Sequence, residues 1–103
     1  MSTFVEYVTY GRADGVSEEK LLELRRQAIL DVKAAHPDLL SVPAIARKDD
    51  GSYLDIWVYA SKEAGDAANA GAGEIPGFMA FFGAVTDVEI RGGIMPDSAQ
   101  SPL

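Results

Sequence analysis

A short turn in the middle of the chain most constrains the fold. Residues 48–52 read Lys-Asp-Asp-Gly-Ser, and an Asp-Gly pair supplies the positive φ angles that a tight β-hairpin requires. Apolar and β-branched residues fill both flanks of this turn, at 39–47 and at 53–59. These flanks predict two antiparallel strands. Pro43 lacks a backbone N–H, so the first of them is predicted to be an edge or bulged strand.

Helical patterns lie on both outer sides of the hairpin. After Ser17, a predicted N-cap, apolar residues recur at a spacing of three to four until His36, where the following proline ends the helix. Ser61 is predicted to cap a second helix that runs through an alanine-rich stretch to about residue 70. Pro76 suits the first position of a further helical turn.

Two more strands, at 3–10 and 85–94, complete the order β-α-β-β-α-β. This order predicts an α+β, ferredoxin-like domain over residues 1–95. Right-handed crossovers place both helices on one face of a four-stranded antiparallel sheet. Residues 96–103 are small and polar, and we expect a flexible C-terminal tail there.

The strand at 53–59 alternates between two kinds of side chain. Leu54, Ile56 and Val58 are aliphatic, and we expect them to lie under the helices. The opposite face, which we expect to be bare, would carry the polar and aromatic residues Asp55, Trp57, Tyr59, Glu6, Tyr10 or Tyr7, Glu89 and Arg91. Such a face is too apolar for water and too polar for a dry core, so the sequence predicts that two copies of the chain cover it as a homodimer.

Composition excludes several classes of protein. The absence of cysteine rules out disulfides, thiolate metal sites and thiol catalysis. The net charge is −7 and nine basic residues are scattered, so we expect no nucleic-acid partner, with Arg25 and Arg26 as solvated helix residues. No apolar run approaches the roughly 20 residues that span a bilayer, and no signal peptide is visible. We therefore expect a cytoplasmic protein without a membrane partner.

The layout resembles a known family. The elements that carry the resemblance are the strand at 4–10, the helix opened by Ser-Glu-Glu at 17–19, the hairpin at 50–52, the strand at 54–59 with Ser-Lys-Glu-Ala at 61–64, and the aromatic stretch at 78–82. Over residues 3–95 the chain resembles antibiotic-biosynthesis-monooxygenase-like (ABM) domains of the dimeric α/β-barrel superfamily. The resemblance implies a homodimer with a ligand pocket between each sheet and its helices. Some members oxygenate phenolic substrates without a cofactor, and others degrade haem.

Candidate site residues follow from this resemblance. Trp57, Tyr59 and Tyr7 would line the pocket, Arg91 would stabilise an anionic substrate oxygen, and Asn69 would orient a substrate carbonyl. The remaining candidates are the aromatic patch and two carboxyls that would serve as a general base: Phe78, Phe81, Phe82, Glu6 and Asp55. Each has a structural alternative: interface or core packing for the aromatics, an exposed helix end for the amide, and a salt bridge with Arg91 for the carboxylates.

The histidine content bears on the haem alternative. His36 is the only histidine, and it closes the first helix, whereas a haem-degrading member needs a histidine on the helix at 61–83. Asp49 and Asp50 offer too few ligands for a metal. The leading hypothesis is a monooxygenase-like homodimer that needs no cofactor and binds or oxidises a small aromatic or apolar molecule. The alternatives are a non-catalytic ligand-binding barrel, and an isomerase or lyase with Glu6 or Asp55 as base.

Overall fold

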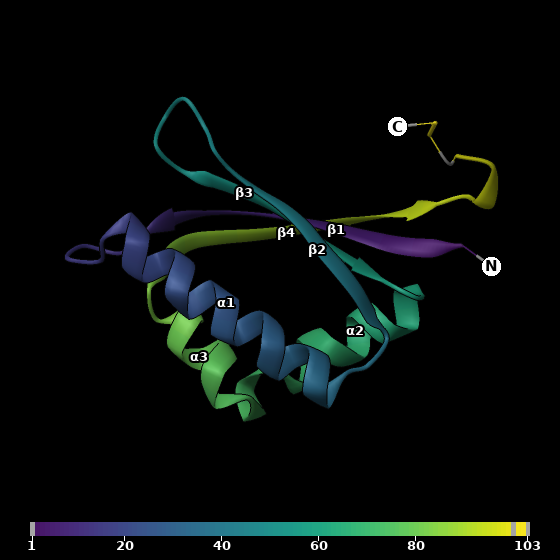
Figure 1. Cartoon of the computed structure of the whole chain (residues 1–103), viewed down its shortest axis with the longest axis horizontal. Coiled ribbons are helices and arrows are strands. Elements are labelled where there is room, and N and C mark those ends of the chain that lie inside the picture. The colour runs from purple at the N-terminus through teal and green to yellow at the C-terminus, as the bar shows by residue number, and fades with distance from the viewer. Residues whose placement is uncertain (1, 100, 103) are drawn as a thin grey trace.

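The computed structural model describes residues 2–99, 101 and 102. The strands are β1 (Thr3–Arg12), β2 (Leu39–Arg47), β3 (Tyr53–Tyr59) and β4 (Val85–Met95), and the helices are α1 (Glu18–Ala35), α2 (Lys62–Gly71) and α3 (Pro76–Phe82), with short 3₁₀ turns at Ala72–Glu74 and Asp97–Ala99. The strands form one antiparallel sheet in the order β2-β3-β1-β4, and the helices cover one of its faces (Figure 1). The predicted ferredoxin-like fold is confirmed, with α3 as an additional helix.

The local signals in the sequence act as predicted. Ser17 Oγ accepts a hydrogen bond of 3.1 Å from the backbone N–H of Lys20, and Ser61 Oγ accepts one of 3.1 Å from Ala64. Pro76 occupies the start of α3. β2 is an edge strand, and its pairing with β3 shifts register on either side of Ser41, within the segment that contains Pro43. Caps and breakers therefore set the element boundaries.

The prediction for the two faces of β3 is wrong. The buried residues of this strand are the polar and aromatic set, Tyr53, Asp55, Trp57 and Tyr59. Leu54, Ile56 and Val58 are half-buried and lie on the open face. The large rings fill the deep space between sheet and helices, which short aliphatic chains would leave empty. The argument that a bare Trp57 face requires a partner therefore no longer holds.

The register of β1 extends this correction to its neighbours. Glu6 lies opposite Trp57 and therefore shares the helix-covered face. Tyr7 lies opposite Ile56 on one side and Arg91 on the other, so both Tyr7 and Arg91 belong to the open face. The expectation that they share a face with Trp57 is wrong, because successive strand residues point to opposite sides. Arg91 instead lies 3.9 Å from Glu89 in an exposed ion pair.

The ring of Phe4 brings α2 close to the sheet. It lies between Gly65 of α2 and Gly92 of β4, and a Cβ on Gly65 would come within 2.8 Å of Phe4 Cδ2. A glycine is required at this contact because any side chain would push the helix outward. Asn69 follows Gly65 by one helical turn and shares its face of α2. The close approach of α2 to the sheet therefore brings Asn69 near β1.

Candidate functional site

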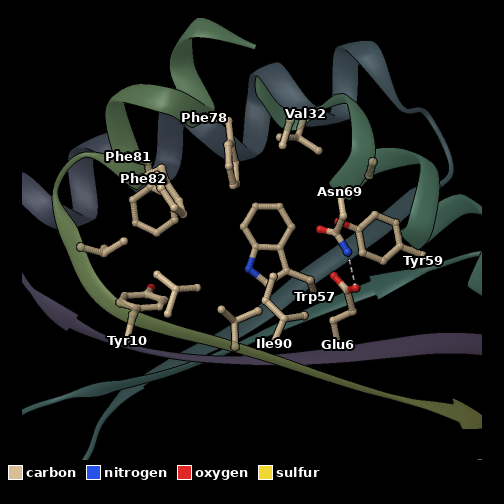
Figure 2. A pocket seen from close by; sticks show the side chains of 15 residues that line it. Glu6, Tyr10, Val32, Trp57, Tyr59, Asn69, Phe78, Phe81, Phe82 and Ile90 are labelled. Atoms are coloured by element: carbon tan, nitrogen blue, oxygen red, sulfur yellow. Dashed lines mark hydrogen bonds between the residues drawn. The ribbon is translucent and has the colours of Figure 1, made fainter. Parts of the chain in front are cut away.

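A pocket lies between the sheet and the helices (Figure 2). It holds about 640 Å³ of empty space, counting its opening to solvent. Its lining consists mainly of apolar and aromatic side chains: Glu6, Val8, Tyr10, Val32, Trp57, Tyr59, Ala68, Asn69, Ala72, Phe78, Phe81, Phe82, Val85, Val88 and Ile90. Phe82 and Ile90 are exposed, so an opening lies between α3 and the edge strand β4.

Three phenylalanines of α3 form one wall of the pocket. The rings of Phe78 and Phe82 stack at 6.2 Å, and Phe81 meets Phe78 edge-on at 6.5 Å and Tyr10 edge-on at 5.7 Å. α3 can lie close to α1 because Gly77 has no side chain, since a Cβ there would overlap the side chain of Asp31. The aromatic patch therefore lines the pocket and also packs against the core.

Trp57 rises from the sheet into the middle of the pocket. Figure 2 shows Phe78 above its ring, Glu6 and Asn69 to one side, and Tyr10 to the other. Its indole nitrogen lies on the cavity side and makes no hydrogen bond to any part of the chain that the structure describes. An indole N–H is a donor only. Trp57 therefore offers a hydrogen bond to whatever fills the cavity.

A carboxyl and an amide form the polar end of the pocket. Glu6 is 5% exposed, and Asn69 Nδ2 donates a hydrogen bond of 2.7 Å to Glu6 Oε2. Burial raises the pKa of Glu6; the hydrogen bond from Asn69 opposes this rise, and the charge of Asp66 adds to it. Burial and the charge of Glu6 also raise the pKa of Tyr59, which therefore keeps its proton. Glu6 is thus a buried carboxyl with raised proton affinity that lines the pocket.

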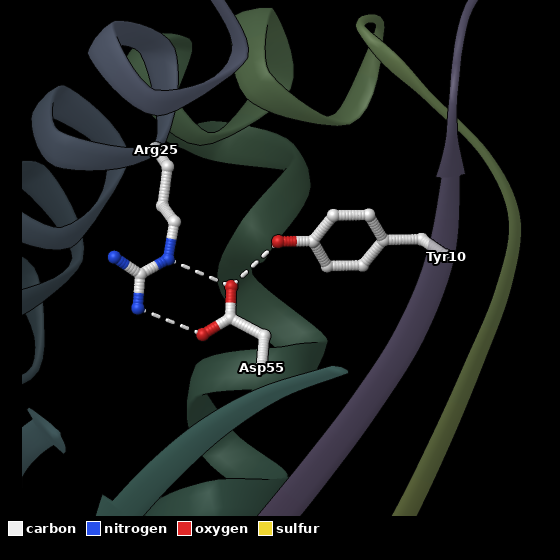
Figure 3. Close-up of polar contacts among 3 residues, drawn as sticks. All are labelled: Tyr10, Arg25 and Asp55. Atoms are coloured by element: carbon white, nitrogen blue, oxygen red, sulfur yellow. Dashed lines mark hydrogen bonds and ion pairs between the residues drawn. The ribbon is translucent and has the colours of Figure 1, made fainter. Parts of the chain in front are cut away.

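Asp55 does not line the pocket. It is fully buried, with Oδ2 2.8 Å from Arg25 Nε and Oδ1 2.9 Å from Arg25 Nη2, while the Tyr10 hydroxyl donates a hydrogen bond of 2.7 Å to Oδ2 (Figure 3). Both of its oxygens are occupied, so it is a poor candidate for a base. The expectation that Arg25 is solvated is wrong, since its side chain is 13% exposed. The ion pair instead holds Tyr10 in place as a wall of the pocket.

The pocket gathers most, but not all, of the residues proposed from the sequence. It contains Trp57, Asn69, Tyr59, Glu6, Phe78, Phe81 and Phe82, and it leaves out Tyr7, Arg91 and Asp55. Sequence reasoning offered Tyr10 only as an alternative to Tyr7, and it missed Val8 and Ile90. The period of two from Glu6 through Val8 to Tyr10 was the signal that places these side chains on one face.

The described residues contain little that would hold a metal. No group of three or more His, Cys, Asp or Glu side chains among them is arranged to bind an ion. Of the lining residues, Glu6 is the single carboxyl, and none is Lys, Arg or His. No helix within these residues is long and apolar enough to cross a membrane.

Comparisons with known proteins show the fold. Neither a family model nor a curated protein matches this sequence. The solved structure of SnoaB, a cofactor-independent oxygenase from Streptomyces nogalater, matches with a TM-score of 0.67 and 18% identity over 100% of both chains. A NIPSNAP family protein from Agrobacterium tumefaciens matches with a TM-score of 0.63 and 22% identity, over 92% of this chain and 87% of that one. A Caulobacter crescentus protein assigned to the antibiotic biosynthesis monooxygenases matches with a TM-score of 0.64 and 17% identity, over 89% of this chain and 88% of that one. The chain therefore has an ABM-like fold.

Proposed function

We propose that the protein binds a small, electron-rich aromatic molecule in this pocket and oxygenates it without a cofactor. The observation that carries the proposal is the arrangement around Trp57, where aromatic walls enclose a cavity-facing indole N–H and the buried carboxyl of Glu6. The likeness to SnoaB supports the same chemistry, because that protein is a cofactor-independent oxygenase.

The proposed chemistry needs a base and an oxyanion donor, and the pocket offers both. Glu6 takes the proton of a phenolic hydroxyl, directly or through one water molecule. The indole N–H of Trp57 donates a hydrogen bond to the phenolate oxygen that forms. The electron-rich ring then reduces O₂ at its free para carbon. One oxygen atom enters the ring as a quinone carbonyl, and the other leaves as water with the two hydrogens that the phenol loses.

Oxygen uptake tests this proposal. With 1,5-dihydroxynaphthalene as the probe, we expect one O₂ consumed for each 5-hydroxy-1,4-naphthoquinone formed, measured by an oxygen electrode and by absorbance. Trp57→Phe keeps a ring but removes the N–H, and we expect it to lower kcat about a hundredfold. Tyr7→Phe is the matched control, because it removes a polar hydrogen on the open face and should leave kcat unchanged. Probe binding without oxygen uptake would refute the oxygenase.

The buried carboxyl favours a second candidate function. An isomerase or lyase that uses Glu6 as its base would profit from the raised pKa of this group, which brings the carboxyl closer to neutral pH. Such an enzyme would turn over without oxygen and would fail on Glu6→Gln. A carrier would bind the molecule and leave it unchanged. Incubating the protein with the small molecule that it retains, once with and once without oxygen, separates these activities. An isomerase or lyase turns over in both cases, an oxygenase turns over only with oxygen, and a carrier does so in neither.

We also propose that two copies of the chain pair through the open face of the sheet. The reason differs from the one that the sequence suggested, because this face carries aliphatic residues and not Trp57. Its central strands present Val5, Tyr7, Leu54, Ile56 and Val58. Tyr7 is 42% exposed and the others are half-buried. A contiguous apolar face of this kind is typical of an interface.

Native mass spectrometry tests this pairing and reports any retained small molecule. We expect the wild-type protein to be a dimer and Ile56→Glu to be a monomer, because two carboxylates would be buried at the centre of the interface. Leu30→Glu makes the same kind of change on an exposed position of α1 and should leave the dimer intact. A wild-type monomer at micromolar concentration would refute the pairing.

A further inference from the structure

One carboxyl, that of Glu6, lines the pocket, and among the lining residues of the described chain no Lys, Arg or His is present to balance a second negative charge. The charged side chain that acts on the pKa of Glu6 is Asp66 of α2, which is also negative and raises this pKa. Asp66 is exposed and its carboxylate lies 2.7 Å from Lys62 Nζ, so the cation of this pair neutralises Asp66 outside the pocket.

The other polar groups that line the pocket do not offset a second negative charge. Asn69 already uses an amide N–H on Glu6 Oε2. Tyr59 and Tyr10 keep their protons, because burial and neighbouring carboxylates raise the pKa of both. Trp57 has no titrating proton in this range. Two like charges in an apolar site repel strongly, and the usual outcome is that one of them takes up a proton.

Resting on the proposed aromatic-binding pocket, we propose that it selects neutral aromatic molecules with a hydroxyl group, and that it accepts a carboxylate-bearing aromatic molecule only together with a proton on Glu6. A phenol satisfies this condition at every step. Its proton moves to Glu6 when the phenolate forms, so the site never holds more than one negative charge. An aromatic acid brings its own charge and must draw a proton from solvent. Glu6 is therefore a specificity-determining residue.

Two probes that share the naphthalene ring and its substituted position test this inference by isothermal titration calorimetry. 2-Naphthol is neutral near pH 7, whereas 2-naphthoate is an anion. We expect the wild-type protein to bind 2-naphthol at least tenfold more tightly than 2-naphthoate. The affinity for 2-naphthoate should fall by up to about tenfold for each pH unit above the pKa of Glu6, as expected when binding takes up one proton. Titrations in buffers of different ionisation enthalpy should show that uptake directly.

Glu6→Gln removes the charge but keeps an acceptor for Asn69. In this variant we expect 2-naphthoate to bind about as tightly as 2-naphthol, with no pH dependence and no proton uptake. Glu63→Gln is the matched control, because it makes the same change on the exposed first turn of α2 and should behave as wild type. If Glu6→Gln fails to fold, the proton uptake of the wild-type protein alone decides the question.

The outcomes separate this inference from the proposed function. If the wild-type protein binds both probes equally and without proton uptake, charge selection is wrong, while the aromatic pocket stands. If it binds neither probe, the aromatic-binding function fails and takes this inference with it. If the wild-type protein prefers 2-naphthol and Glu6→Gln binds both probes about equally, the result supports both charge selection and the aromatic-binding function.

Discussion

Asp55→Ala is expected to lower the free energy of unfolding by about 3–5 kcal/mol. The substitution removes a fully buried carboxylate that binds the Arg25 guanidinium at two points and accepts a hydrogen bond from the Tyr10 hydroxyl. Arg25 would be left as a mostly buried cation without a partner, and the Tyr10 hydroxyl would lose its acceptor. An unpaired cation and an unpaired hydroxyl each have a higher free energy in the protein interior than in water. Urea denaturation of the two proteins measures the loss.

A surface carboxylate provides the control for this prediction. Glu89→Ala also removes a carboxylate from an ion pair, but Glu89 and Arg91 are exposed, so we expect a change of about 0–1 kcal/mol. In the double variant Arg25→Ala/Asp55→Ala neither partner remains unpaired, and it should be more stable than the sum of the single losses implies. Equal losses for Asp55→Ala and Glu89→Ala would show that the buried pair does not stabilise the fold.

Phe81→Ala should lower the free energy of unfolding by a similar amount, about 3–5 kcal/mol. Phe81 is buried, and its ring meets Tyr10 at 5.7 Å and Phe78 at 6.5 Å. Removing it would leave a void where α3 joins the sheet, and the wall of the pocket would lose its support. The same variant should therefore bind 2-naphthol more weakly. Urea denaturation and calorimetry measure the two effects on one preparation.

Phe82 is the matched comparison on the same helix. Its side chain is exposed at the mouth of the pocket and stacks on Phe78 at 6.2 Å. Because nearly half of this side chain is exposed, Phe82→Ala should cost about 1 kcal/mol or less in stability. It should still weaken ligand binding, because the ring is part of the lining. A large loss of stability in Phe82→Ala would contradict the division between a core phenylalanine and a mouth phenylalanine.

Part of the candidate site could be predicted because strand alternation is periodic. Because side chains alternate along a strand, Tyr59 must lie on the same face as Trp57. Glu6 lies on this face too, because it is paired directly with Trp57 across the antiparallel strands. The position of Asn69 depends instead on how closely α2 approaches the sheet, which Gly65 and Phe4 decide. Spacing within one strand is local information, whereas the distance between a helix and a sheet results from packing.

The partner of Asp55 illustrates what sequence reasoning cannot supply. Arg25 lies 30 positions earlier on a helix rich in charged residues, where a solvated arginine is the usual expectation. Only the packing of α1 against the sheet brings the guanidinium over β3. The same contact removes Asp55 from the candidate bases and leaves Glu6 as the buried carboxyl that lines the pocket.

The sequence by itself determined the elements, their order and most of their boundaries, because these depend on local rules. The rules are the Asp-Gly turn at 50–51, the serine caps at Ser17 and Ser61, the end of α1 before Pro37 and the start of α3 at Pro76. It also determined that β3 has two unlike faces. Only the tertiary structure decided which face the helices cover, because alternation is symmetric and does not distinguish inside from outside. The rings of Trp57 and Tyr59 fill the deeper space, and that choice placed the pocket between sheet and helices, with Glu6 inside and with Tyr7 and Arg91 outside.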